Sequence, residues 1–229
     1  MGTIRKKIDA LPPLVRSKLF NGLALAANYP GQALVEGLCS GTYPEQMAGI
    51  LTTLGLTEDC ARMEDLTGRY ASKPSHFPKH LLELEKAYTR MCFASKPRQV
   101  YLFGSVYNEG KLLQESTFEI ARLYHEAGLQ VDDTFRLPPD HIALELEFMA
   151  YLCHQESQAA MEMETDRAAY AKRLQGVVID HHLGPFAYRF GKKMMEHAPE
   201  GFYRVAAQLL TSLFAGFDKA DTGPAAAAK

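Results

Sequence analysis

The stretch that is most informative about the fold, residues 138–149, reads PPDHIALELEFM. A residue that precedes a proline avoids the helical conformation, so the paired prolines indicate an extended turn. Beyond them the apolar residues recur at the spacing of one helix face, as Ile142, Leu146, Met149 and Cys153. We therefore predict a helix over 141–154 that buries this face against other helices.

The two polar residues at this turn are candidates for a functional site. Asp140 is placed to cap the new helix, because its carboxylate could accept a backbone N–H of the first turn. His141 would follow on that turn with its ring free to face a neighbour, and Glu145 lies four residues later on the same face. One interpretation is a cap, a surface histidine and a local pair. The other is a polar hot spot that offers carboxylates to a ligand through charge-assisted hydrogen bonds.

The rest of the chain carries the same helical pattern. Strand-like alternation is nearly absent, and the apolar run at 100–103 is an isolated exception. Apolar spacing and stop signals predict further helices at 14–28, 32–39, from Pro44, from Thr57 as a cap, and at 80–93, 112–127, 157–182, 185–197 and 200–217. The sequence thus predicts an all-α protein, a single compact helical domain of about ten helices over 1–220 with a disordered tail at 221–229.

Two long stretches between these helices lack a helical pattern. Residues 94–110 carry Tyr101, Phe103 and Tyr107 between glycines and prolines, which indicates an ordered loop rather than a flexible linker. Residues 129–139 form the second connection, which leads directly into the Asp-His pair. Long ordered loops in a compact domain often carry function, so we advance the hypothesis that the two connections meet in space.

Composition limits the classes of function. The chain has 229 residues, a formal net charge of −2 and 47% hydrophobic residues, which suffice for a core but provide no basic field for nucleic acid. The four cysteines form no CxxC pair, so neither a zinc ribbon nor a disulfide framework is expected. No apolar run reaches the roughly 20 residues that cross a bilayer, and no leader peptide is visible, so we expect a cytoplasmic protein without membrane insertion.

Signatures of catalysis are missing, and we predict that the chain is not an enzyme. It contains no GxSxG, no GxxxxGK[ST] and no GxGxxG motif. Asp180, His181 and His182 suggest a metal site, but consecutive helix residues point about 100° apart, so one ion does not easily take all three. We expect no metal and interpret His182 as a cap at a helix C-terminus. A helical metal-dependent hydrolase that uses Asp180, His181 and His141 is one alternative.

Several segments resemble, in order, the TorD/DmsD/NarJ family of redox-enzyme maturation chaperones, the twin-arginine proofreading chaperones. The Pro-Asp-His at 139–141 with Glu-Leu-Glu-Phe-Met at 145–149 is similar to the family's signature. Gly-Ser-Val-Tyr at 104–107, the helix with its glycine stop at 120–129, His-Leu-Gly-Pro-Phe at 182–186 and Phe-Tyr-Arg at 202–204 also match. The resemblance extends over residues 85–215.

The resemblance implies a cytoplasmic, system-specific chaperone for a molybdopterin-dependent oxidoreductase. Its partner would be the catalytic subunit of that enzyme, bound through the N-terminal twin-arginine signal peptide until the cofactor is inserted. No resident cofactor is implied, apart from a weak guanine-nucleotide site that no motif in this chain supports. The family also implies a monomer or a domain-swapped dimer. A generic assembly or scaffold protein without peptide specificity is the second alternative.

The resemblance also implies a peptide groove. It would be formed by Tyr88, Met91, Phe103, Tyr107, Pro139, Asp140, His141 and Glu145. The carboxylates would take the arginines and the apolar side chains would take the hydrophobic part of the peptide. Helical spacing alone would assign Tyr88 and Met91 to the core. Some relatives carry tryptophan in this groove, whereas this chain has none, so tyrosine and phenylalanine would supply its wall.

Overall fold

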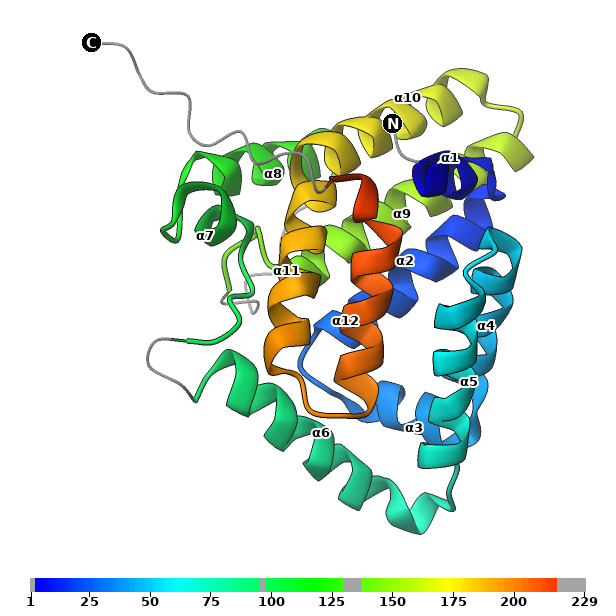
Figure 1. Ribbon diagram of the computed structural model, residues 1–229. Helices are drawn as coiled ribbons and strands as arrows, with labels where there is room; N and C mark the ends of the chain where they lie inside the picture. The colour runs from blue at the N-terminus through cyan, green and yellow to red at the C-terminus, as the bar shows by residue number, and fades with distance from the viewer. Residues whose placement is uncertain (1–2, 95–97, 130–136, 218–229) are drawn as a thin grey trace.

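A computed structural model describes residues 3–94, 98–129 and 137–217, and these residues are almost entirely helical (Figure 1). The α-helices are α1 (Thr3–Ala10), α2 (Pro13–Ala27), α3 (Gln32–Ser40), α4 (Thr42–Leu54), α5 (Thr57–Tyr70), α6 (Phe77–Cys92), α7 (Gly104–Glu109), α8 (Glu115–Glu126), α9 (Ile142–Met161), α10 (Thr165–Val178), α11 (Gly184–His197) and α12 (Phe202–Leu213). Short turns η1 (Pro74–His76), η2 (Ile179–Leu183) and η3 (Ala215–Phe217) join or extend them. No β-strand is formed within the three described ranges, so the all-α prediction is confirmed.

Helix α9 lies at the centre of the fold, between α2 and α10. Its predicted apolar face, Ile142, Leu146, Met149 and Cys153, is fully buried. The helix continues to Met161, past the break that we predicted after residue 154. Glu156, within the predicted break, lies inside the protein and has an arginine partner there.

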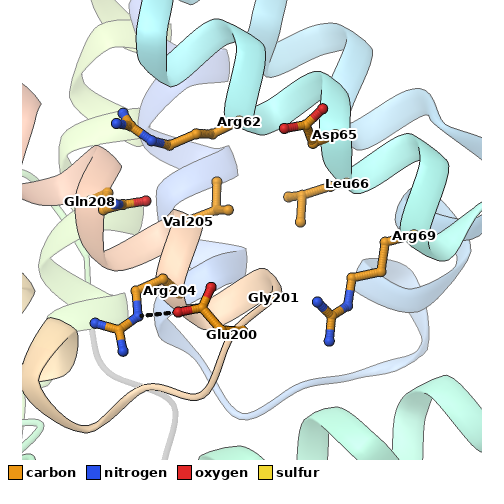
Figure 2. Close-up of a pocket in the computed structure, with 9 residues that line it drawn as sticks. All are labelled: Arg62, Asp65, Leu66, Arg69, Glu200, Gly201, Arg204, Val205 and Gln208. Atoms are coloured by element: carbon orange, nitrogen blue, oxygen red, sulfur yellow. Dashed lines mark ion pairs between the residues drawn. The ribbon is translucent and has the colours of Figure 1, made fainter.

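The remaining helices pack as pairs around α2 and α9. Figure 1 shows α11 beside α12, α4 beside α5 at one side, and α7 with α8 at the other. A cleft of about 690 Å³ opens between α5 and α12, and Figure 2 shows the residues that line it. No helix in the described parts of the chain has the length and apolar character to cross a membrane.

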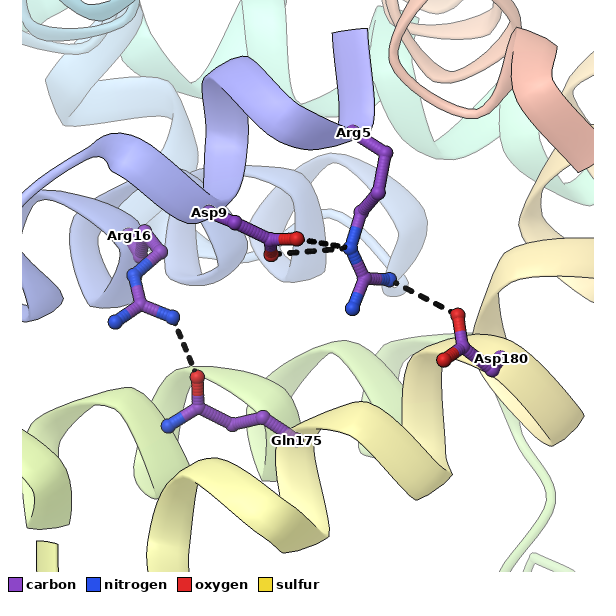
Figure 3. Close-up of polar contacts among 5 residues, drawn as sticks. All are labelled: Arg5, Asp9, Arg16, Gln175 and Asp180. Atoms are coloured by element: carbon purple, nitrogen blue, oxygen red, sulfur yellow. Dashed lines mark hydrogen bonds and ion pairs between the residues drawn. The ribbon is translucent and has the colours of Figure 1, made fainter. Parts of the chain in front are cut away.

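A polar network ties α2, α9 and α10 together inside the core. Figure 3 shows its Arg16–Gln175 contact and the neighbouring pairs of Arg5. The Arg16 guanidinium donates to Glu156 at 2.8 Å and to Gln175 at 2.6 Å. Nearby, Arg5 pairs with Asp9 at 2.9 Å and with Asp180 at 3.4 Å, which joins α1 to η2. A buried charge must be paired, so these contacts fix the register of the helices that carry them.

Three local predictions were wrong. Thr57 is the first residue of α5 rather than its cap, because Leu56 occupies the cap position without a side-chain hydrogen bond. His182 does not end a helix: η2 is a turn of π-helix that leads directly into α11, with Pro185 in its first turn. The region expected to be a loop at 94–110 contains α7, which begins after Phe103.

Two predictions fall on residues outside the described ranges. The second connection includes residues 130–136, and the predicted tail covers residues 221–229. The single helical domain is the fold that was expected, whereas its limit at residue 220 stays a prediction.

Candidate functional site

The two connections cross next to the N-terminus of α9. Phe103 and His141 form an isolated antiparallel bridge. The Gly104 N–H donates to the Asp140 carbonyl at 2.9 Å, and the Ile142 N–H donates to the Leu102 carbonyl at 2.9 Å. The first connection therefore meets the Asp-His pair at the end of the second, as the hypothesis expected, whereas residues 130–136 of the second connection lie outside the described ranges.

Asp140 stabilises α7 rather than its own helix. Its Oδ2 accepts the Ser105 N–H at 2.7 Å, in the first turn of α7, and the residue is only 1% exposed. Our prediction that Asp140 caps α9 was wrong, because the chain is still extended at the next residue, His141. Asp140 thus lies one residue too early to reach the α9 amides.

His141 is the cap of α9, and its ring is buried rather than at the surface. Its Nδ1 accepts the Ala143 N–H at 3.2 Å, so this nitrogen carries no proton in the folded protein. Burial lowers the pKa of His141 to about 4, although the Asp140 charge opposes the shift. The ring meets Phe103 edge-on, with 5.6 Å between the ring centroids.

Glu145 is a second buried carboxyl group one turn further along α9. It is 2% exposed and packs against Gly104: a methyl group on that glycine would lie 3.3 Å from Oε1 of Glu145. Burial, and secondarily the Asp140 charge, raise the pKa of Glu145 well above its ordinary value. Burial therefore favours the neutral acid form of Glu145.

The crossing contains polar atoms with unused hydrogen-bonding capacity. Oδ1 of Asp140, Oε2 of Glu145 and Oγ of Ser105 are buried and have no hydrogen-bond partner among the described residues. Leaving such atoms unsatisfied costs about 1–3 kcal/mol each. Buried carboxyl oxygens without partners are suited to receive a cationic donor such as a guanidinium.

Aromatic side chains surround these carboxyl groups. The Tyr124 hydroxyl donates a hydrogen bond to the Pro139 carbonyl at 2.8 Å. The Tyr124 ring meets the Phe148 ring edge-on, with 4.7 Å between the ring centroids. Tyr107 donates to the Tyr101 carbonyl at 3.0 Å. Half-buried Pro139 and Tyr107 are the most accessible of the predicted groove residues.

Arg189 of α11 attaches α7 to the body of the protein. It donates to the carbonyl of Tyr107 and to the side chain of Asn108. Phe186, one turn earlier on α11, lies against the Tyr107 ring, with 5.3 Å between centroids. These contacts hold α7 in place, with Ser105 and Gly104 against Asp140 and Glu145.

Tyr88 and Met91 lie in an aromatic cluster next to the crossing. Tyr88 is buried and donates to the Ala27 carbonyl at 3.0 Å, and Met91 is 1% exposed. The Met91 carbonyl accepts the Val100 N–H at 3.1 Å, so the first connection starts from this cluster. The cluster reaches the surface through Tyr29 and Phe93, which are 48% and 45% exposed.

Sequence reasoning missed several residues of this region. Ser105 was inside a quoted segment, but nothing indicated that its amide would bind Asp140. No spacing connects Arg189 to α7, 82 residues earlier in the chain. Tyr29 directly precedes the Pro-Gly pair that ends the first predicted helix, and nothing in the sequence links it to Tyr88. In the structure the two rings meet edge-on, with 5.6 Å between their centroids.

Comparison with known proteins places the chain in a family. Residues 55–191, more than half of the chain, match the model of the nitrate reductase delta subunit family. The chaperone protein TorD of Vibrio parahaemolyticus is 29% identical over 110 residues, which are 47% of this chain and 50% of that protein. The chaperone protein TorD of Salmonella arizonae is 28% identical over 116 residues, 51% of this chain and 52% of that protein. The match thus spans about half the length of these curated relatives.

A solved structure shares the fold. The crystal structure of a protein described as a redox enzyme maturation protein from Archaeoglobus fulgidus superposes with a TM-score of 0.50 at 18% identity, over 87% of this chain and 93% of that chain. The family model, the curated relatives and this fold agree with one another. The chain belongs to the nitrate reductase delta subunit family, the family of TorD and NarJ.

Proposed function

We propose that this protein is a maturation chaperone that binds the N-terminal twin-arginine signal peptide of the catalytic subunit of a molybdopterin-dependent oxidoreductase. It would hold that subunit until the cofactor is inserted. The observation that carries the proposal is the pair of buried carboxyl groups, Asp140 and Glu145, whose free oxygens lie at the crossing of two connections. The names of the TorD relatives support the chaperone role.

The first step of binding would be the arrival of a guanidinium at the crossing. A guanidinium presents a planar fork of donors that matches a carboxylate. Oδ1 of Asp140 and Oε2 of Glu145 would accept these donors, and Glu145 would lose its proton as the positive charge enters. α7 would have to move to admit the guanidinium, because its residues Gly104 and Ser105 lie against Glu145 and Asp140.

The second step would be burial of the hydrophobic part of the peptide. Phe103, Tyr107 and Pro139 adjoin the carboxyl groups, and the cluster of Tyr88 and Met91 continues this apolar region to exposed Tyr29 and Phe93. Aromatic anchors of this kind carry much of the free energy at peptide interfaces. The proposed mechanism is binding, and it calls for no resident cofactor or metal.

Calorimetry with a panel of twin-arginine signal peptides from molybdenum enzymes tests the proposal. Asp140→Asn keeps an oxygen for the Ser105 amide but removes the charge, so we expect at least tenfold weaker binding. Asp166→Asn, which changes an exposed carboxylate on α10, is the matched control and should bind like the wild type. A peptide in which both arginines are glutamine should bind poorly to every variant.

Tyr107→Ala tests the apolar part separately. We expect weaker binding that persists at high salt, whereas the loss from Asp140→Asn should shrink as salt screens the charge. Equal affinity of wild type and Asp140→Asn for every peptide would contradict the proposed site. Circular dichroism of each variant establishes that the helices are retained.

A further inference from the structure

Helix α7 is held at its two ends by opposite charges from distant parts of the chain. At its N-terminal end the Asp140 carboxylate accepts the Ser105 N–H at 2.7 Å. At its C-terminal end the Arg189 guanidinium donates to the Tyr107 carbonyl and to the Asn108 side chain. A helix of six residues is too short to persist alone in water, and each charge has the sign that stabilises the helix end it contacts. These two contacts therefore keep α7 folded and in place.

Apolar burial contributes little to the C-terminal half of α7. The two buried residues of this helix are its first two, whereas the four that follow are half-buried or exposed. Arg189 is fixed to its own helix, because its Nε donates to the Pro185 carbonyl, one turn earlier on α11, at 3.1 Å. The polar contacts of an oriented guanidinium thus carry much of the attachment of this half of α7 to α11.

The segment that follows α7 has the backbone of a hinge. Gly110 ends the helix with a φ of 76°, a left-handed conformation that glycine adopts without strain. Leu113 has a φ of 57°, which is unfavourable for a residue with a bulky side chain, and this side chain is 56% exposed. Across the hinge, Glu109 accepts hydrogen bonds from the N–H and the hydroxyl of Ser116. The end of α7 is therefore joined to the start of α8, and α7 can turn about residues 110–113 while α8 keeps its place.

We propose that Arg189 is a latch that holds α7 against the Asp140–Glu145 pair and thereby regulates how readily the crossing admits its ligand. This role of Arg189 rests on the proposed function and deepens it. With the latch formed, Gly104 and Ser105 lie against the two carboxyl groups. When Arg189 releases the end of α7, the first turn of α7 separates from these groups and a guanidinium takes their free oxygens. The apparent affinity for the peptide is then the intrinsic affinity multiplied by the fraction of molecules in which α7 is open.

Hydrogen exchange of the full chain without peptide tests the latch by itself. Arg189→Ala removes both contacts to the end of α7, and we expect the α7 amides to exchange about tenfold faster, because exchange reports the population of the open form. Asn108→Ala removes one of these contacts at an exposed side chain and should give a smaller increase in the same amides. The matched control is Lys192→Ala, which removes an exposed cation of α11 that lies over the Tyr188 ring rather than against α7. Its α7 amides should exchange at the wild-type rate.

Calorimetry with a twin-arginine peptide tests the regulation. The dissociation constant should fall by the same factor by which α7 exchange rises, both in Arg189→Ala and in Asn108→Ala, and should stay unchanged in Lys192→Ala. A residue that only stabilised the binding site would have the opposite effect, because its loss would weaken binding. If Arg189→Ala does not fold, Asn108→Ala decides the question, since its side chain is exposed.

Two results would overturn the latch and leave the proposed function intact. One is wild-type α7 exchange in both Arg189→Ala and Asn108→Ala. The other is equal or weaker affinity of these variants for a peptide that binds the wild type. Failure of every peptide to bind the wild type and Arg189→Ala alike would instead contradict the proposed function, and the regulatory role of Arg189 with it. Binding to Arg189→Ala alone would support the latch.

Discussion

Glu145 and His141 are buried ionisable side chains on one turn of α9, and they make stability depend on pH in opposite directions. The folded-state pKa of Glu145 is raised, so its stabilising contribution is complete at acidic pH and is lost as the pH rises above its unfolded value of about 4.5. We expect Glu145→Gln to raise the melting temperature at pH 8 more than at pH 5, because the amide has no proton to lose. Thermal melts of both proteins across this range measure the difference. An increase that is constant with pH would show that Glu145 does not titrate on unfolding.

The contribution of His141 to stability depends on pH in the opposite direction. Its folded-state pKa is lowered to about 4, so its contribution is present above the unfolded value of 6.5 and is lost as the pH falls towards 4. A shift of this size corresponds to about 3 kcal/mol. His141→Asn keeps a helix-capping acceptor but cannot be protonated, so we expect urea unfolding between pH 7 and pH 4 to show a smaller loss of stability in the variant. Parallel curves for both proteins would contradict the buried, neutral state of His141.

At the scale of elements, the Arg16–Glu156 pair leads to a prediction about the stability of the α2–α9–α10 core. Glu156→Ala would leave a buried guanidinium without its carboxylate, which costs about 3–5 kcal/mol. The control is Glu162→Ala, which breaks an exposed pair with Arg167 and should cost less than about 1 kcal/mol. Urea unfolding of the two variants provides the comparison, and similar losses in both would refute a structural role for the buried pair.

The elements also show what the sequence could and could not predict. The buried face of α9 was predicted correctly, because apolar spacing along one helix is a local signal. The length of α9 was not predicted correctly, because Glu156 is a polar residue whose partner, Arg16, lies 140 residues away in the sequence. α7 was missed for a similar reason: its six residues have no helical periodicity of their own, and Asp140 and Arg189 hold it from distant parts of the chain.

The candidate site was predictable only in part at the scale of the whole molecule. Sequence pattern suggested that two connections carry function, and the structure shows that they cross. It could not indicate that Asp140 faces α7, since the choice between capping α9 and binding Ser105 depends on how the connections pack. Burial of the carboxyl groups likewise arises from the complete fold, because α7, α9 and α11 together enclose Glu145.

This enclosure leads to a prediction about peptide binding and motion of the whole chain. If a signal peptide takes the free oxygens of Asp140 and Glu145, α7 would have to move, because its residues Gly104 and Ser105 lie against these two carboxyl groups. We expect hydrogen exchange of the α7 amides to become faster when an arginine-bearing signal peptide binds, while exchange in the α11–α12 pair stays unchanged. Mass spectrometry of the exchanged full chain resolves these regions. Asp140→Asn serves as the control, because with little peptide bound its α7 exchange should stay at the unliganded rate. Slower α7 exchange on binding would show instead that the peptide docks on the closed form and that the buried carboxyl groups do not receive its arginines.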